Sequence, residues 1–202
     1  MKMTRRKFLN VSTAAAVVCA ATLLPVEKAA AAQQTMAAQE LLEQAYLYAF
    51  PLVLMDATRK VSTNTETPND TRAPINQFIH AKKLADAASR AVVTPNVDTI
   101  YTQAFLDVSA EPMLYGVPQT DRFFNVQVLD AWTNTVAVLE APGLYAITRS
   151  DWQGKLPEGV QRINVPTNMV WTIARIVLSG QEDLPNVRAI QDRMQLMPLS
   201  AY

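Results

Sequence analysis

The sequence predicts an α+β fold in which N-terminal helices pack on a mainly antiparallel sheet, with a further helix at the C-terminus. Two patterns predict it. Apolar residues recur at helical spacing early in the chain, and short β-branched and aromatic runs dominate from Val92 onward. A chain of 202 residues, half of them apolar, can bury the core of one domain. We place this single domain over residues 33–202, after an export signal over residues 1–32.

Apolar residues at helical spacing predict helices in three segments. Over residues 36–60, apolar side chains such as Leu41 and Leu52 fall on one face at helical spacing. A shorter apolar periodicity predicts a second helix over residues 76–91, and another predicts a closing helix over residues 182–197. These segments supply the helical part of the predicted fold.

Strands are expected where apolar and polar residues alternate over short runs. Val126 and Val128 share one face, and Val136 and Val138 share another, which is typical of a half-buried antiparallel sheet. The segment Thr167–Gly180 fits either a buried strand or a helix, and its length favours a helix. The predicted strands cover residues 99–107, 112–117, 123–130, 134–140, 143–148 and 161–165.

The first 32 residues have the order of a twin-arginine export signal. Arg5 and Arg6 precede an apolar run, and the small residues Ala30 to Ala32 provide a cleavage site. The apolar run is too short and too rich in alanine for a membrane span. An amphipathic or membrane-anchoring N-terminus is the alternative, and the flanking residues favour it less. We therefore expect the twin-arginine translocation machinery as a partner, a periplasmic or secreted location, and no stable membrane anchor after cleavage.

Charge and composition argue against several classes of function. The signal holds five of the 18 basic residues and one of the 18 acidic residues, so 13 basic and 17 acidic residues remain. This mildly acidic balance is not typical of nucleic-acid binding. Cys19, the only cysteine, lies in the signal, and His80 is the only histidine. We therefore expect no metal site and no cofactor in the mature protein.

Polar residues before the first predicted strand are candidate site residues. In the stretch Thr94–Tyr101, TPNVDTIY, Asn96 and Asp98 can each bind backbone amides two residues on and form a turn. The same stretch can instead offer an amide, a carboxylate and the phenol of Tyr101 to a ligand. If the protein is an enzyme, Asp98 or His80 is the candidate general base. Residue chemistry leaves the structural and functional interpretations open.

A set of segments occurs in a characteristic order along the chain: AYLYAFPLV, NQFIHAKKL, TPNVDTIYTQAFLDVSAEP, RFFNVQVLDAWTN, APGLYAIT, VPTNMVWTIARI and PLSAY. Together they resemble the N-terminal domain of the family called domain of unknown function 1254, over roughly residues 40–202. The resemblance places the family's Pro-Asn-x-Asp-Thr-x-Tyr motif on residues 95–101. It also places family motifs on Asp130, Asn134 and Arg175, which join Asn96 and Tyr101 as ligand-binding candidates.

The resemblance also implies an exported bacterial protein and a second, β-rich domain that would begin where this chain ends. Three hypotheses on function follow. The first is a periplasmic small-molecule-binding or assembly module, which includes a homo-oligomer. The second is a cofactor-independent hydrolase or isomerase, in which Asp98 or His80 is the base while Tyr101 and Arg175 steer the substrate. The third is half of a split or truncated protein that needs a separate C-terminal-domain chain.

Overall fold

The computed structural model describes residues 37–90 and 94–202. The chain forms two compact units, Met1–Phe50 and Pro51–Tyr202. The expected export signal lies outside the described residues, and so do its four candidate residues, Arg5, Arg6, Ala30 and Ala32.

Helical residues occupy the described part of the first unit and the start of the second. Residues 37–50 are helical throughout, and residues 51–62 open the second unit as helix. These ranges confirm the helix predicted over residues 36–60. None of the helices formed by the described residues is long and apolar enough to cross a bilayer.

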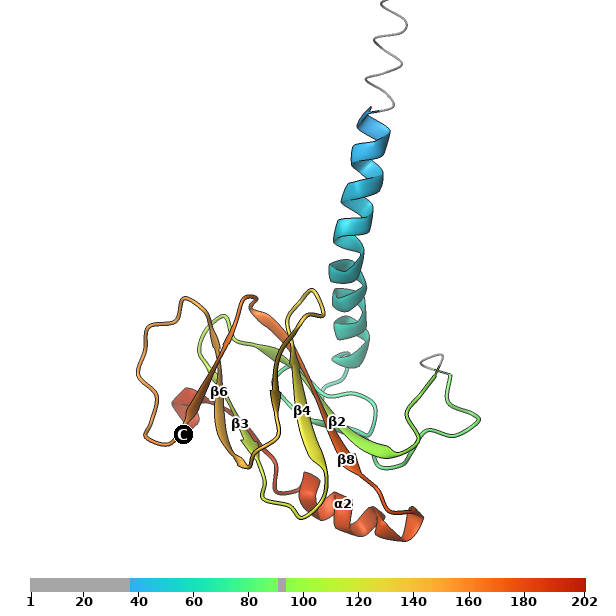
Figure 1. The fold of residues 1–202 in the computed structure, drawn as a ribbon, viewed down its shortest axis with the longest axis vertical. Coiled ribbons are helices and arrows are strands. Elements are labelled where there is room, and N and C mark those ends of the chain that lie inside the picture. Colours follow the sequence, from blue (N-terminus) through green and yellow to red (C-terminus); the bar gives the residue numbers. More distant parts are fainter. Residues whose placement is uncertain (1–36, 91–93) are drawn as a thin grey trace, which may run out of the picture. The chain divides into compact units, whose positions relative to one another are not determined.

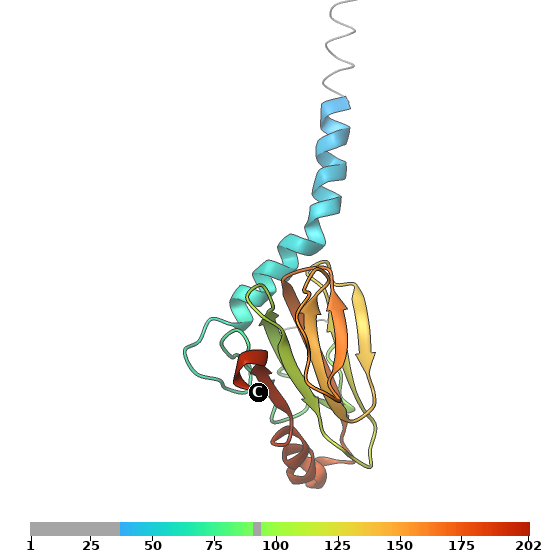
Figure 2. The ribbon, with the colours of Figure 1, turned by 90° about the vertical axis from the view of Figure 1, so that its left-hand side faces the viewer.

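The second unit contains two β-sheets that share one core (Figures 1 and 2). The five-stranded sheet has the order β1-β2-β8-β4-β5, and the four-stranded sheet has the order β7-β6-β3-β9. Neighbouring strands are antiparallel, with the exception of the parallel pair β6 and β7. The strands are β1 (Ile79–His80), β2 (Thr99–Asp107), β3 (Met113–Val117), β4 (Phe124–Leu129), β5 (Thr135–Leu139), β6 (Gly143–Arg149), β7 (Gln161–Val165), β8 (Met169–Val177) and β9 (Gln195–Pro198).

The core between the sheets is filled by alternate residues of the strands. Ile100, Ala104 and Leu106 of β2 meet Tyr115 of β3 and Ile147 of β6 in one cluster, and each is at most 1% exposed. Burying a large apolar side chain contributes about 1.5–3 kcal/mol. Because successive side chains of a strand point to opposite faces, the odd-numbered positions of β2 face the other side of the five-stranded sheet.

The C-terminal helix α2 (Leu184–Gln191) closes one end of the second unit, below the strands in Figure 1. It follows the 3-10 turn η1 (Gln181–Asp183), and Pro185 lies in its first turn, where a missing amide hydrogen bond costs nothing. Val187 and Ile190 of α2 are buried in the core. Beyond α2 the chain returns as β9 beside β3, and it ends in the 3-10 turn η2 (Leu199–Ala201).

The structure confirms all six predicted strands and the α+β class, and it corrects three local predictions. The described part of the segment predicted as a helix over residues 76–91, residues 76–90, is not helical, because β1 pairs with β2 and the other residues form turns, bends and irregular chain. Most of Thr167–Gly180 is strand β8, the centre of the five-stranded sheet, and not a helix. The closing helix is shorter than predicted, since residues 195–198 form β9.

Candidate functional site

The turn before β2 is closed by Asn96. Its side-chain oxygen Oδ1 accepts the backbone N–H of Asp98 at 2.7 Å and that of Thr99 at 2.9 Å. Asp98 accepts the backbone N–H of Leu178 through its carbonyl, at 3.2 Å. The Asp98 carboxylate is exposed and has no hydrogen-bond partner among the described residues. Of the two side chains that the sequence offers for this turn, Asn96 forms it and Asp98 does not.

A cavity of about 520 Å³ lies beside this turn. Small-molecule sites have volumes in this range. Its lining includes Asn96 and Tyr101, two of the predicted ligand-binding residues, whereas Asp98, His80 and Arg175 are not among the lining residues. The lining residues are Asp70, Thr71, Ala81, Lys82, Lys83, Leu84, Ala85, Ser89, Thr94, Pro95, Asn96, Thr99, Tyr101 and Gln103.

β2 provides one wall of this cavity, which we call the β2 cavity. Thr99, Tyr101 and Gln103 line it from alternate positions of the strand. The Thr99 hydroxyl is buried and has no hydrogen-bond partner among the described residues. Arg175 is the register partner of Tyr101 on β8, and its guanidinium carbon lies 5.6 Å from the centroid of the Tyr101 ring. Its Nη2 donates to Gln127 Oε1 at 3.0 Å, so Arg175 is held next to the cavity wall.

Asp130 and Asn134 lie elsewhere, in the hairpin between β4 and β5. The carboxylate of Asp130 accepts the backbone N–H groups of Trp132 and Asn134, both at 2.9 Å, and the side-chain amide of Asn134 at 3.0 Å. Thr133 has the positive φ of 68° that this tight connection requires. The three hydrogen bonds occupy the carboxylate, and Asp130 as a whole is 3% exposed. The geometry of this pair is that of a turn.

The hairpin and the β2 cavity lie at opposite ends of the five-stranded sheet. Thr99 pairs with Val177 at one end of β2, and Asp107 pairs with Met169 at the other. Ala131, next to Asp130, donates its backbone N–H to the Thr167 hydroxyl at 2.9 Å, which places the hairpin at the second end. The nine residues of β2 span roughly 27 Å. The candidate residues that the family resemblance places on motifs therefore do not meet in one cavity. They are Asn96, Asp98, Tyr101, Asp130, Asn134 and Arg175, and only Asn96 and Tyr101 line the β2 cavity.

His80 belongs to a polar cluster at the core side of β2. Its Nδ1 lies 2.9 Å from the Thr102 hydroxyl, and Gln191 Nε2 donates to the same hydroxyl at 3.1 Å. Thr102 and Gln191 are buried. Burial lowers the pKa of His80, and the charge of Lys82 acts in the same direction while Asp192 opposes it. Burial thus favours the neutral form of the ring, whose Nδ1 is engaged with Thr102.

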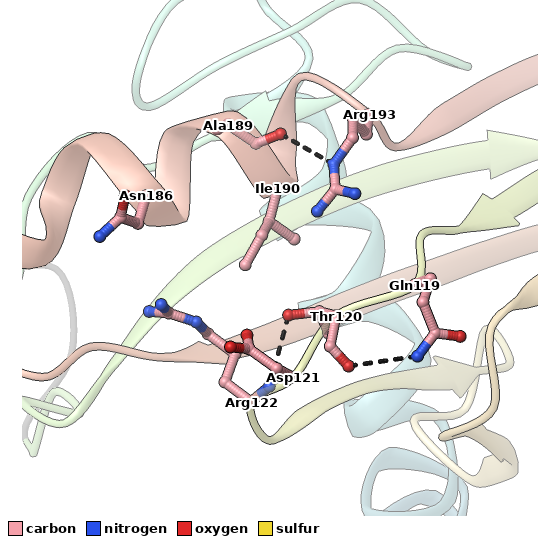
Figure 3. Close-up of a pocket in the computed structure, with 8 residues that line it drawn as sticks. All are labelled: Gln119, Thr120, Asp121, Arg122, Asn186, Ala189, Ile190 and Arg193. Carbon is pink, nitrogen blue, oxygen red and sulfur yellow. Dashed lines mark hydrogen bonds between the residues drawn. The ribbon is translucent and has the colours of Figure 1, made fainter.

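A second pocket, of about 570 Å³, lies between α2 and the connection from β3 to β4 (Figure 3). The guanidinium groups of Arg122 and Arg193 lie on either side of Ile190 in Figure 3. Arg122 is paired with Asp183 and also donates to the carbonyl of Val177 at 3.2 Å. This pairing holds the pKa of the Asp183 carboxyl well below its usual range. Arg122 therefore joins the β3–β4 connection to η1, and its guanidinium group is already engaged by the fold. Because this pocket offers a ligand fewer unpaired groups, the β2 cavity is the better candidate for a ligand site.

No cluster of three or more His, Cys, Asp or Glu side chains that could hold a metal ion occurs within residues 37–90 and 94–202. The polar groups that surround the β2 cavity are hydroxyl, amide and ammonium groups and one carboxylate, that of Asp70, and such groups bind organic ligands by hydrogen bonds and charge.

Sequence reasoning missed Thr99, Gln103, Lys82 and Lys83 as residues of this site. Thr99 and Gln103 could have been found, because they share the face of Tyr101 at a spacing of two residues along the predicted strand. The two lysines could not, since the pairing of β1 with β2 brings them there.

The fold and the cavity define an α+β protein with two packed sheets and a pocket at the start of one central strand. A family profile described as "Protein of unknown function (DUF1254)" matches residues 75–198, more than half of the sequence, and the chain belongs to this family. The resemblance inferred from the sequence motifs is thereby confirmed. No curated protein matched the sequence.

Solved structures similar to this chain include proteins from two bacteria. The VPA0106 protein from Vibrio parahaemolyticus aligns with a TM-score of 0.65 and 24% identity, over 80% of this chain and 38% of its own. An uncharacterized protein from Burkholderia cenocepacia aligns with a TM-score of 0.40 and 16% identity, over 63% of this chain and 36% of its own. The first similarity supports the fold, and this chain spans well under half the length of both proteins.

Proposed function

We propose that this chain is an exported protein that binds a small molecule in the β2 cavity. The observation that carries the proposal is that the stretch Thr94–Tyr101, which holds the family's motif, forms part of the wall of a cavity of about 520 Å³. Its turn residue Asn96 and its strand residues Thr99 and Tyr101 all line this space. The twin-arginine pattern at Arg5 and Arg6 supports a periplasmic or secreted location.

The geometry favours binding over catalysis. A general base must lie within hydrogen-bonding reach of the proton that it removes. Neither Asp98 nor His80 is among the residues that line the β2 cavity. His80 is engaged with Thr102, and the Asp98 carboxylate is exposed. A ligand in the cavity therefore contacts hydrogen-bonding and charged groups, but it does not contact either candidate base.

A thermal-shift screen of small molecules on the exported, signal-free protein tests the proposal. A ligand present at about 100 times its Kd stabilises a protein by about 2.7 kcal/mol, which raises the Tm of a domain of this size by roughly 5–10 °C. Ala85 lines the cavity, and Ala85→Trp fills part of it. Ala87→Trp is the matched control, because Ala87 is exposed and is not a lining residue.

We expect at least one compound to raise the Tm of the wild type and of Ala87→Trp, and to leave that of Ala85→Trp unchanged. A screen without any stabilising compound, or a compound that stabilises both tryptophan variants equally, would show that the β2 cavity is not a ligand site.

A further inference from the structure

The hydrogen bonds of the fold leave unpaired donor groups on side chains that line the β2 cavity. Asn96 uses its Oδ1 to accept two backbone amides, and Gln103 uses its Oε1 to accept the indole N–H of Trp171 at 3.1 Å. The side-chain NH₂ groups of Asn96 and Gln103 have no partner within the described part of the chain. In each amide the oxygen thus accepts hydrogen bonds from the fold, while the NH₂ group remains able to donate.

Other polar groups around the cavity are also without partners. The Thr99 hydroxyl is buried and unpaired, a state that costs free energy unless a ligand or water satisfies it. The Tyr101 hydroxyl and the Lys82 ammonium group make no hydrogen bond to any other described residue. Both hydroxyls and the ammonium group can donate to a ligand, and the ammonium group can do nothing else.

The charges around the cavity are mainly positive. The lining contains Lys82, Lys83 and a single carboxylate, that of Asp70. Lys83 is partly neutralised by Asp86 at 3.4 Å, an exposed pair. Arg175 contributes a further positive charge, since its guanidinium group lies over the ring of Tyr101. Although the mature chain is mildly acidic as a whole, the β2 cavity therefore attracts an anion.

The remaining lining is apolar and limits what kind of anion fits. Ala81, Leu84, Ala85 and Pro95 face the same space, together with the ring of Tyr101. A free inorganic anion would leave this surface in contact with water. A carboxylate accepts several hydrogen bonds, and an attached hydrocarbon portion covers the apolar residues.

We infer that the ligand of the β2 cavity is a small carboxylic acid with an apolar tail. The carboxylate binds the unpaired donors at the β2 wall, and the tail lies against the alanine, leucine and proline side chains. This inference rests on the proposed function, and it adds the chemical class of the ligand.

The test compares hexanoate with hexanamide, which has a similar size and no charge. Binding to the exported, signal-free protein is measured by ligand-observed NMR titration at about pH 7.5, where the acid is ionised. We expect hexanoate to bind at least about 10-fold more tightly, because charge-assisted hydrogen bonds are roughly twice as strong as neutral ones.

Asn96→Asp separates the site from the turn. A carboxylate at this position still accepts the N–H groups of Asp98 and Thr99, but it loses the NH₂ donor and brings a negative charge to the cavity. We expect about 10-fold weaker hexanoate binding with an unchanged Tm. Asn64→Asp, at an exposed position that does not line the cavity, is the control with the same change in charge and should bind like the wild type.

Equal affinity for hexanoate and hexanamide, or equal hexanoate affinity of the Asn96→Asp protein and the wild type, would overturn the carboxylate inference. If neither compound binds and the thermal-shift screen yields another ligand that Ala85→Trp excludes, the carboxylate inference is wrong and the binding function stands. If the screen also yields nothing, both are wrong.

Discussion

Removing the carboxylate of Asp130 should destabilise the fold, although the signature motif alone makes Asp130 a candidate for ligand binding. In the hairpin between β4 and β5 this carboxylate accepts three hydrogen bonds, from the backbone of Trp132 and from the backbone and side chain of Asn134. Asp130→Ala removes the acceptor for all three. It leaves the backbone N–H groups of Trp132 and Asn134, which lie in a partly buried hairpin, without their carboxylate acceptor.

The magnitude follows from these two amides. Leaving one partly buried backbone donor unpaired costs about 1–3 kcal/mol. Because the hairpin is at the end of the sheet and can admit water, we take the middle of this range for each, which gives a loss of about 3–4 kcal/mol in the free energy of unfolding. For a domain of this size the Tm should fall by roughly 6–16 °C.

Urea unfolding followed by tryptophan fluorescence measures this loss. Asp98→Ala is the matched control, since it removes an exposed carboxylate that makes no hydrogen bond to the described residues. We expect its free energy of unfolding to stay within about 0.5 kcal/mol of the wild type. If Asp130→Ala unfolds at the same urea concentration as the wild type, or if both variants lose equal stability, the assignment of Asp130 to the turn is wrong.

Two further predictions concern the histidine and the export signal. Burial lowers the pKa of His80 in the folded protein. As the pH falls through about 6.5, His80 is therefore protonated in the unfolded chain before it is protonated in the folded protein. The free energy of unfolding decreases over this range, until the pH is below the folded pKa. His80→Asn should reduce the difference between the urea midpoints at about pH 7.5 and about pH 5.5, and an undiminished difference would contradict the effect of burial. Replacing Arg5 and Arg6 by lysine should retain the protein in the cytoplasm on cell fractionation, because lysine lacks the planar guanidinium group; an unchanged exported fraction would exclude a twin-arginine signal.

The strands of this fold were predictable because their alternation is local. β2 and β7 have the predicted bounds, since both run between clear turn residues. β8 was not predictable, because it lies between β2 and β4 and carries apolar or aromatic residues toward both faces, which hides the period of two. β9 depends on pairing with β3, some 80 residues earlier in the chain, and no local pattern reports such a pairing.

The site was predictable only where the cavity is built from one continuous stretch. Asn96 and Tyr101 were identified because turn residues and an outward-facing aromatic residue are visible in the sequence. Lys82 reaches the same cavity through the pairing of His80 with Thr102. A helix over residues 76–91 would have left Lys82 on a helix surface, so the error in secondary structure concealed this part of the site.

Motif membership alone does not distinguish the residues that fold this protein from those that can bind a ligand, but an inventory of each side chain's hydrogen bonds does. Both carboxylate oxygens of Asp130 accept hydrogen bonds within its own hairpin, so they are not available to a ligand. Neither carboxylate oxygen of Asp98 is bonded to another described residue, but Asp98 is not among the residues that line the cavity. Asn96 is the intermediate case, because its oxygen closes the turn while its NH₂ group remains unpaired beside the cavity. The same amide thus starts β2 and supplies a donor at the wall of the β2 cavity, so a residue required for the fold can also contribute to binding.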